Sequence, residues 1–256
     1  MLNTVICGNS ENILREIITD SINLVITSPP YDSNRDYNGY TFNFEKIANE
    51  LFRIVQIGGV IVWIVGDTTL NGSETGTSFR QALYFKDLGF NLHDTMIWHK
   101  RASPFPNKTR YNQIFDYMFI LSKGKPSTIN LIQDKKNKCF GEAVHGTNRL
   151  KNGKTKKLKN LNQKIREFGI RENIWSISNP GIKNNKHPAV FPYTLAYDHI
   201  ITWSKPGDLV LDPFCGSGTA LKAAKDLKRN YIGVDISEDY CKISRDRLQI
   251  ENRLFE

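Results

Sequence analysis

The sequence has few of the features that mark secreted, zinc-binding or membrane-spanning proteins. Its four cysteines are scattered, and no two of them form a C-x-x-C pair. This spacing argues against a disulfide framework and a zinc site, and it favours thiols buried as small side chains. No apolar run approaches the length of a membrane span, no charged and then apolar leader opens the chain, and there is no internal repeat. We therefore expect a cytosolic protein that needs no metal.

The basic residues are concentrated in one quarter of the chain. The formal net charge is +9 at pH 7. Between Ser122 and His187 there are 16 Lys and Arg residues against 4 Asp and Glu, whereas the rest of the chain has 19 against 22. Such a segment is either an ordinary lysine-rich surface or a face that binds nucleic-acid phosphates. Charge by itself leaves both interpretations open.

The order of predicted elements indicates an α/β fold, and 256 residues are enough for one domain with a substantial core. Apolar runs predict strands at 4–7, 22–27, 60–65, 95–98, 115–121, 208–211 and 231–235, with 95–98 and 115–121 as a hairpin-like pair. Helical spacing predicts helices at 11–18, 44–55, 78–88, 192–203, 220–228 and 238–248, with a short one at 161–168. We expect Ser10 to cap the first helix and Gly58-Gly59 to end the second. Strands alternating with helices predict a mostly parallel sheet covered on both faces.

A glycine-containing turn near the C-terminus has the pattern of a cofactor loop. The segment Asp212 to Thr219 (D-P-F-C-G-S-G-T) follows the predicted strand 208–211 and precedes a helix. Asp235 ends the next strand, where a carboxylate can accept hydrogen bonds from both hydroxyls of a ribose. This pattern suits NAD as well as S-adenosylmethionine. Leu221 favours the latter, because it stands where a dinucleotide fold needs a small residue, and Asp212 would repel a pyrophosphate.

A second segment, Thr27-Ser28-Pro29-Pro30-Tyr31, follows the predicted strand 22–27. An amino group on a base is a poor nucleophile, since its lone pair is delocalised into the ring. Acceptors aimed at its N–H bonds would help it to attack a methyl sulfonium, and the Ser28 side chain and the Pro29 carbonyl are suited to this. Pro30 stiffens the turn, and Tyr31 offers a face on which an extruded base can stack. The alternative is an ordinary turn after a strand.

Together, and with the target motif before the cofactor motif, these two segments resemble the beta group of amino-methylating DNA methyltransferases. The resemblance covers roughly residues 3 to 248. It implies a Rossmann-like methyltransferase fold with a mostly parallel seven-stranded sheet and a circularly permuted motif order. It also implies methyl transfer from S-adenosylmethionine to a flipped base. T-S-P-P-Y is typical of cytosine-N4 methylation, and adenine-N6 methylation is the main alternative. A protein or RNA methyltransferase, a non-catalytic DNA-binding homologue and a dehydrogenase are further alternatives.

The resemblance implies roles for individual residues around the cofactor. Asp212 would hold the methionine ammonium, and Phe214 would lie near the sulfonium. His187 to Pro192 resembles the family's H-P-A-x-F-P segment, whose helix lines the methionine pocket. Asn9 stands in place of the acid that receives the adenine amino group, and Ile236 would pack on the adenine. The expected cofactor-binding set is Cys7, Gly8, Asn9, His187, Pro188, Phe191, Asp212, Pro213, Phe214, Cys215, Gly216, Ser217, Gly218, Thr219, Asp235, Ile236 and Ser237.

The resemblance also places double-stranded DNA on the basic segment. Residues of about 124–186 occupy the family's target-recognition region, as an insertion in a single methyltransferase domain of residues 1–256. The expected DNA-binding residues are Arg35, Lys100, Arg101, Lys151, Lys154, Lys156 and Lys157. Phosphate contacts position such a protein, and side chains that reach base edges set its specificity. The resemblance implies a cytoplasmic enzyme of a bacterium, an archaeon or a phage, in a restriction-modification system. It leaves open a separate cognate endonuclease and a homodimer.

Overall fold

The computed structural model of the protein describes residues 2–30, 43–101, 108–178 and 192–249. The chain divides into two compact units. The main unit contains residues 1–130 and 173–256, and the small unit contains residues 131–172. Within the described ranges, no helix is long and apolar enough to cross a membrane.

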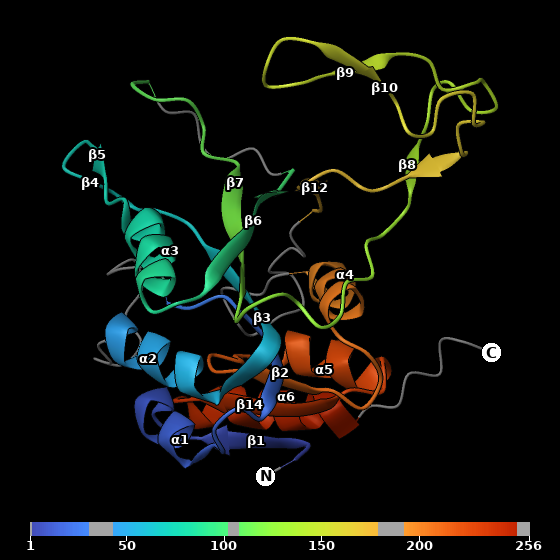
Figure 1. The fold of residues 1–256 in the computed structure, drawn as a ribbon. Coiled ribbons are helices and arrows are strands. Elements are labelled where there is room, and N and C mark those ends of the chain that lie inside the picture. The colour runs from blue at the N-terminus through green and yellow to red at the C-terminus, as the bar shows by residue number, and fades with distance from the viewer. Residues whose placement is uncertain (1, 31–42, 102–107, 179–191, 250–256) are drawn as a thin grey trace. The chain divides into compact units, whose positions relative to one another are not determined.

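The main unit is built on one eight-stranded sheet with the order β1-β14-β13-β2-β3-β7-β6-β12 (Figure 1). The strands are β1 Thr4–Cys7, β2 Ile22–Thr27, β3 Val55–Val65, β6 Asn91–His99, β7 Phe115–Ser122, β12 Ile174–Ser176, β13 Leu209–Asp212 and β14 Asn230–Asp235. Every neighbouring pair is parallel except the two pairs made by β7. This confirms the mostly parallel sheet and the hairpin-like pairing of β6 with β7. The sheet has eight strands where we expected seven, because β12 adds to the edge beside β6.

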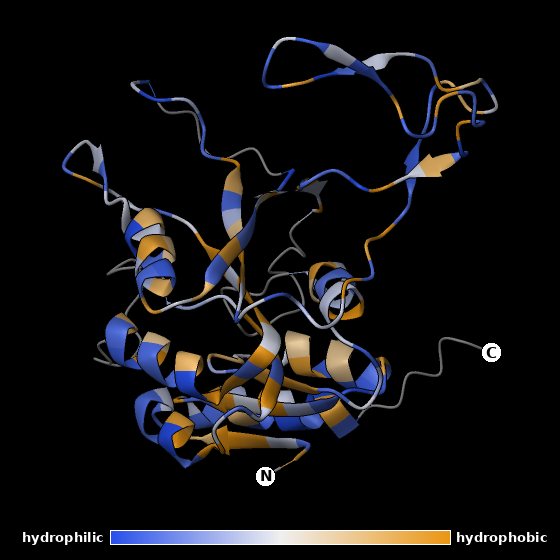
Figure 2. Ribbon diagram, viewed as in Figure 1, coloured by the Kyte–Doolittle hydropathy of each residue, from blue (hydrophilic) through white to orange (hydrophobic). Residues whose placement is uncertain are grey.

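Helices cover both faces of this sheet, which is why its central strands are continuous apolar runs. The helices α1 (Ser10–Glu16), α2 (Phe44–Ile54) and α3 (Thr77–Asp87) pack on one face, and α4 (Tyr193–Trp203), α5 (Thr219–Asp226) and α6 (Glu238–Gln249) pack on the other. A short hairpin, β4 (Thr69–Leu70) and β5 (Ser73–Glu74), precedes α3. Apolar residues follow the strands and the inner sides of the helices (Figure 2).

Aromatic side chains fill the core beneath α2 and α3. The Trp63 ring meets Phe85 edge to face at 5.2 Å between centroids, and Phe44 meets both rings. The buried Trp63 indole N–H donates a hydrogen bond to Gln81 Oε1 at 2.8 Å, so its polar group is satisfied. This core fixes the sheet face opposite to the one that carries α4 and α5.

The boundary between α2 and β3 differs from the prediction that Gly58-Gly59 ends the helix. The helix ends at Ile54, and β3 begins at Val55 and contains both glycines. A Cβ atom on Gly59 would lie 2.7 Å from Val55 Cγ1, and Gly58 has a left-handed φ of 83°. Here the register between β2 and β3 shifts. The glycines therefore form an irregularity within a strand, since only glycine fits both positions.

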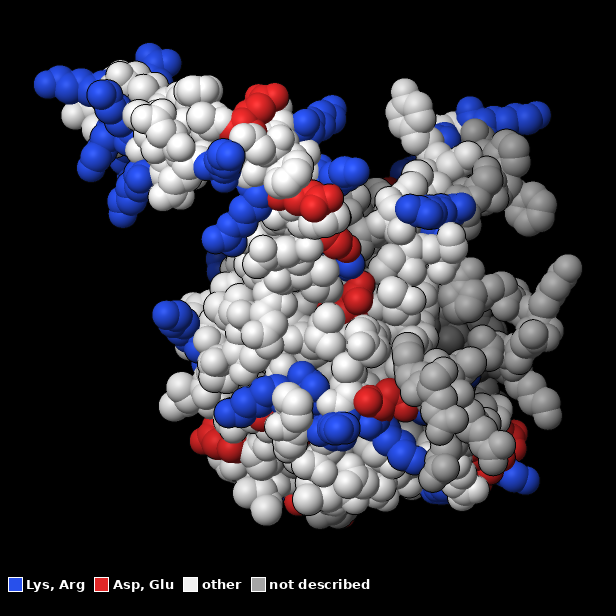
Figure 3. All heavy atoms as spheres, turned by 90° about the vertical axis from the view of Figure 1, so that its right-hand side faces the viewer, with Lys and Arg blue, Asp and Glu red and all other residues white. Residues whose placement is uncertain are grey.

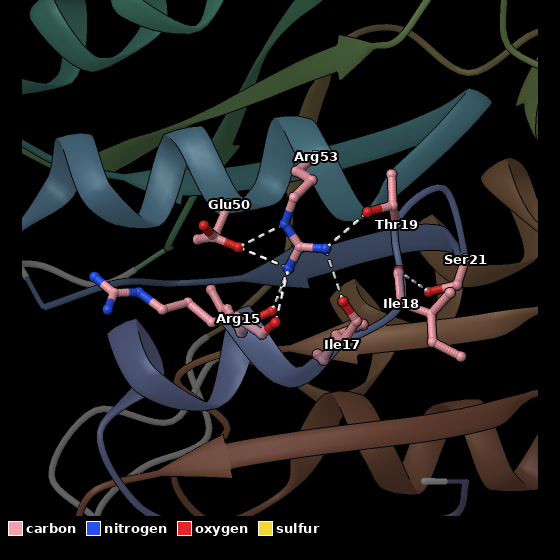
Figure 4. Close-up of polar contacts among 8 residues, drawn as sticks. Arg15, Ile17, Ile18, Thr19, Ser21, Glu50 and Arg53 are labelled. Atoms are coloured by element: carbon pink, nitrogen blue, oxygen red, sulfur yellow. Dashed lines mark hydrogen bonds and ion pairs between the residues drawn. The ribbon is translucent and has the colours of Figure 1, made fainter.

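The first helix is fixed at both ends by side chains from different parts of the chain. Asn9, and not Ser10 as expected, is its N-cap and accepts a hydrogen bond from Glu11 N at 2.8 Å. At its other end, the Arg53 guanidinium of α2 donates to the Leu14 and Ile17 carbonyls at 2.8 and 2.9 Å (Figure 4). The Leu14 carbonyl also accepts from Ile17 N at 3.2 Å, so Arg53 adds a side-chain donor to the C-terminal end of a helix of only seven residues.

The small unit is a long, irregular hairpin. The strands β8 (Lys135–Lys136) and β11 (Phe168–Gly169) pair near its base, and β9 (Thr147–Arg149) and β10 (Thr155–Lys157) pair near its tip. Between them, residues 141–144 bond to residues 162–165. The helix expected at 161–168 is wrong, because this segment bonds across the hairpin instead. Cys215 and Cys241 are buried as expected, but Cys139 is exposed in this unit.

Candidate cofactor and target site

The two predicted motifs meet at one edge of the sheet. β13 lies between β2 and β14, and all three strands are parallel. Leu211 of β13 is level with Val25 of β2, so the residues after both strands leave the sheet side by side. The D-P-F-C-G-S-G-T loop thus begins beside Ser28-Pro29-Pro30. The carboxyl ends of adjacent parallel strands are the usual ligand site of open α/β sheets.

Asp212 is buried at this edge and is held by two hydrogen bonds. Its Oδ1 atom accepts from Thr27 Oγ1 at 2.7 Å and from Phe214 N at 3.1 Å. The side chain is almost wholly removed from solvent. Burial raises the pKa of Asp212 to about 7, and the nearby Asp235 carboxylate adds to the rise, while the two hydrogen bonds oppose it. A cation beside this carboxyl group would favour its ionised form.

The loop after Asp212 is closed by backbone contacts that demand glycine. Cys215 N bonds to Val234 O at 2.9 Å, and Gly218 N bonds to Cys215 O at 2.7 Å. Gly218 has φ 76°, and a Cβ atom there would lie 2.2 Å from Ser244 Oγ. Gly216 also has a left-handed φ, of 48°. Close packing of the loop on Ser244 of α6, together with its left-handed backbone, therefore requires glycine at position 218.

A further close approach explains Leu221, which the sequence marked as unlike a dinucleotide fold. A Cβ atom on Gly233 of β14 would lie 2.3 Å from Leu221 Cδ1 and 3.0 Å from Cys215 Sγ. The small residue is thus in the strand, and the large one is in α5. This arrangement reverses the pattern in which a small helix residue allows helix and strand to pack closely.

Asp235 holds the loop from the neighbouring strand. Its Oδ2 atom accepts from Gly216 N at 2.8 Å, and its Oδ1 atom accepts from Ser237 N at 2.9 Å. Burial raises the pKa of Asp235, against the hydrogen bonds from Ser237 and Gly216. Each carboxylate oxygen has a further lone pair, so the two hydroxyls expected from a ribose can still bind. Two acidic side chains at this edge suit a cationic ligand and would repel phosphates.

Other predicted cofactor residues line the same edge. Cys7 ends β1 level with Asp235, and Gly8 N bonds to Asp235 O at 2.9 Å. Ile236 follows directly and is exposed, unlike most large apolar residues of the sheet, so it can pack on a flat ring. Three of the other predicted polar side chains accept hydrogen bonds within the protein. Asn9 caps α1, the Ser237 hydroxyl accepts from Tyr240 N, and the Thr219 hydroxyl accepts from Arg247.

The structure describes only part of the turn that the sequence predicts to bind the target base. Ser28 and Pro30 are half-buried and Pro29 is buried, directly after β2. The predictions for Tyr31, Arg35, His187, Pro188 and Phe191 lie outside the described residues. Arg101 is exposed, as are Lys151, Lys154, Lys156 and Lys157.

Lys100 differs from the phosphate-binding role expected of it. Its Nζ atom pairs with Asp116 Oδ2 at 2.8 Å and lies 5.4 Å from the centre of the Trp98 ring. Asp116 is buried, so this ammonium compensates a buried carboxylate. Trp98 is also buried and donates from Nε1 to Ile177 O at 2.9 Å. Both side chains therefore stabilise the pairing of β6, β7 and β12.

Two polar residues of this edge were missed by sequence reasoning. Thr27 was taken as the end of a strand, yet its hydroxyl binds Asp212. Asp67 follows β3, and its carboxylate accepts from Ser78 N at 2.9 Å and from the Ser78 hydroxyl at 2.5 Å. Asp67 thereby holds the start of α3. The G-D-T sequence after an apolar strand was a usable signal for it.

This edge presents a buried carboxyl group, a second carboxylate, an exposed isoleucine and, on the adjacent strand, the turn that contains Ser28 and Pro29. An acidic ligand edge at the carboxyl ends of adjacent parallel strands is the arrangement expected of a methyltransferase.

Comparison with known proteins supports the prediction of a methyltransferase. A family model described as DNA methylase matches residues 22–246. The orphan methyltransferase M.BamHII of Bacillus amyloliquefaciens is 54% identical over 244 residues, which cover 92% of each chain. The type II methyltransferase M.HpaI of Haemophilus parainfluenzae is 28% identical over 267 residues, covering 98% of this chain and 76% of that protein. The chain therefore belongs to the N6/N4 DNA methylase family.

Solved structures share the fold. PvuII DNA methyltransferase, described as cytosine-N4-specific, matches with a TM-score of 0.70 and 20% identity, covering 99% of this chain and 88% of that one. A DNA modification methylase of Thermus thermophilus, TTHA0409, solved in complex with S-adenosyl-L-methionine, matches with a TM-score of 0.64 and 23% identity, covering 96% and 94%. The family confirms the predicted DNA methyltransferase, and the solved structures confirm its fold.

Proposed function

We propose that this DNA methyltransferase transfers a methyl group from S-adenosylmethionine to the N4 amino group of a flipped cytosine in double-stranded DNA. The observation that carries the proposal is the position of Ser28-Pro29 beside Asp212, joined through the Thr27 hydroxyl. It puts the acceptors for a base amino group next to the carboxyl group assigned to the cofactor. The Thr-Ser-Pro-Pro sequence of this turn favours cytosine.

The mechanism rests on positioning. When bound, S-adenosylmethionine supplies an electrophilic methyl group on a sulfonium. Asp212 and Asp235 hold its ammonium and ribose ends and so fix the direction of the methyl group. Ser28 Oγ and the Pro29 carbonyl would accept hydrogen bonds from the two N–H groups of the base amino group and so orient its lone pair for attack on the bound methyl donor. The surplus proton leaves to water after transfer, so no general base is needed.

Adenine-N6 methylation is the second candidate, because the family includes enzymes of both kinds. Adenine also presents an amino group conjugated with its ring, so the same two acceptors would serve it. The choice of cytosine rests on the Ser28 position of the motif.

The small unit supplies most of the phosphate contacts in this proposal. It has 12 Lys and Arg residues against 4 Asp and Glu, and Figure 3 shows these basic side chains gathered over it at upper left. Curated relatives are named type II methyltransferases, which extends the proposal to a restriction-modification system. The relative at 54% identity is named an orphan methyltransferase, so the proposal does not include a cognate endonuclease.

The test is the identity of the modified base. The protein is expressed in a host that lacks DNA methylation, and the DNA is digested to nucleosides for mass spectrometry. We expect N4-methylcytosine, and we expect it to disappear in the Asp212→Ala variant. Detection of N6-methyladenine in place of N4-methylcytosine would contradict the proposed target base and support the adenine-N6 candidate. Methylated RNA or protein with unmodified DNA would contradict the proposal as a whole.

A further inference from the structure

The tip of the small unit is a two-stranded ribbon with no core of its own. In β9 and β10, Thr147 pairs with Lys157, Asn148 with Lys156 and Arg149 with Thr155. Residues 150–154 close it, with Leu150 N bonded to Lys154 O at 2.8 Å and Gly153 at φ 80°. Every residue from 147 to 157 is exposed, and no residue of the small unit is buried. Such a ribbon has little stability alone in water, so it is suited to being covered by a partner.

The ribbon has a strong positive charge that its own unit does not neutralise. No Asp or Glu occurs between Ala143 and Arg166, a stretch with eight Lys and Arg residues. Within the described ranges, Arg149, Lys151, Lys154, Lys156 and Lys157 form no ion pair. The acidic residues at the base of the unit are already occupied, since Asp134 pairs with Arg171 and Glu172 with Lys135. This uncompensated charge on a narrow ribbon is complementary to a polyanion such as a nucleic acid.

The two faces of the ribbon differ. Side chains alternate along a strand, so Thr147, Arg149, Thr155 and Lys157 share one face, and Asn148 and Lys156 share the other. The second face continues at Gly146 and Leu158, where the Leu158 side chain lies over the glycine, 3.8 Å from the position of a Cβ atom. The face that carries Asn148 and Lys156 is therefore continuous with side-chain contacts within the small unit. The first face carries polar side chains alone and stays open.

We propose that the β9–β10 ribbon enters the major groove of the target DNA and that Arg149 reads a guanine there. This inference rests on the proposed function. The major groove, about 12 Å wide, admits a two-stranded ribbon, and arginine bound to guanine O6 and N7 is its commonest specific contact. Thr155, directly opposite Arg149, is short and leaves room for the guanidinium to reach a base edge. Lys151 and Lys154, at the turn, hold phosphate. Duplex RNA does not allow this mode of reading, because its major groove is too deep and narrow for side chains to reach the bases.

The experiment compares affinities for duplexes that differ by one base pair. Sequencing that detects methylated bases first defines the motif that the wild-type protein marks in a methylation-free host. Affinities are then measured for that motif and for duplexes altered at each position in turn. The variants are Arg149→Ala and, as a matched control from the other face, Asn148→Ala. Low salt keeps all duplexes bound through phosphate contacts.

For Arg149→Ala we expect discrimination to fall at one guanine position by about 5- to 150-fold, the value of one bidentate contact, and to persist elsewhere. Asn148→Ala should leave discrimination unchanged at every position. An equal loss of affinity for all duplexes, or no loss, would overturn the assignment of Arg149 while leaving the proposed function intact. A wild-type protein that marks no DNA would overturn both.

Discussion

The Thr27 hydroxyl donates a 2.7 Å hydrogen bond to Asp212 Oδ1, across 185 positions of the sequence. Thr27 immediately precedes the Ser28-Pro29-Pro30 turn, and Asp212 opens the D-P-F-C-G-S-G-T loop. A single bond therefore links the strand that leads to the proposed target pocket with the carboxyl group proposed to hold the methyl donor. It also opposes the rise that burial causes in the pKa of Asp212.

Replacing Thr27 with valine should weaken cofactor binding. Valine has nearly the same shape but no donor, and hydrogen bonds to charged groups contribute about 1.5 to 3 kcal/mol. We expect the affinity for S-adenosylhomocysteine, measured by isothermal titration, to fall by about 10- to 150-fold. Thr27→Ser keeps the hydroxyl and should bind nearly as well as the wild type. Equal affinities for the valine and serine variants would show that the bond does not support the cofactor.

Cofactor affinity should depend on pH through Asp212. Its pKa of about 7 in the unliganded protein means that the carboxyl group is largely protonated below neutrality. A ligand ammonium requires the ionised form, so binding must release a proton there. We expect affinity for S-adenosylhomocysteine to rise by up to about tenfold per pH unit below pH 7 and to level off above it. Asp212→Asn should bind weakly with no such dependence, and a wild-type profile that is flat from pH 5.5 to 8 would contradict this account.

The same raised pKa predicts a trend in stability. Between the ordinary Asp pKa of 3.8 and about 7, the folded protein holds a proton on Asp212 that the unfolded chain has lost. The contribution of Asp212 to the free energy of unfolding therefore falls as the pH rises from 3.8 to about 7, and it is constant above that range. Urea unfolding should show that Asp212→Asn loses less stability than the wild type between pH 5 and 7. Parallel curves for the two proteins would show that the folded-state pKa is near its ordinary value.

Ser28→Ala tests the pocket directly. If Ser28 Oγ accepts a hydrogen bond from the reacting amine, its loss should lower single-turnover methyl transfer by about 10²- to 10³-fold, as for one oxyanion-hole donor. Affinity for S-adenosylhomocysteine should stay within a few fold, because Asp212 and Asp235 are unchanged. Wild-type turnover in this variant would mean that other groups orient the amine.

Four lysines of the ribbon should account for part of the salt dependence of DNA binding. Neutralising Lys151, Lys154, Lys156 and Lys157 with glutamine should lower affinity for all sequences and reduce the slope of log affinity against log salt by about one per lost phosphate contact. The matched control neutralises four exposed lysines of the main unit that lie outside residues 124–186, namely Lys86, Lys205, Lys228 and Lys242. Equal slopes for the two quadruple variants would identify the ribbon lysines as ordinary solvated surface.

Local sequence was sufficient for most of the main unit. Runs such as 22–27 and 231–235 became strands with nearly the expected bounds, because an apolar stretch of that length has to be buried on both sides of a sheet. The D-P-F-C-G-S-G-T loop and the Thr-Ser-Pro-Pro turn could also be predicted, because glycine permits backbone conformations that other residues avoid and proline fixes φ. The parallel order of these strands followed from the helices between them.

Tertiary structure decided what depends on partners distant in the chain. Periodicity gives no sign that Thr27 binds Asp212, that Arg53 closes α1 or that Lys100 is paired with Asp116. Nor does it distinguish a helix-ending Gly58-Gly59 from an irregularity inside β3, a choice made by the close packing of Val55 and β2. The small unit was the hardest to predict, because its residues bury almost nothing and are held by backbone bonds across the hairpin. Hydrophobic periodicity reflects burial in the core. Where few residues are buried, as in the small unit, the sequence carries no such pattern and only the tertiary structure shows which strands pair.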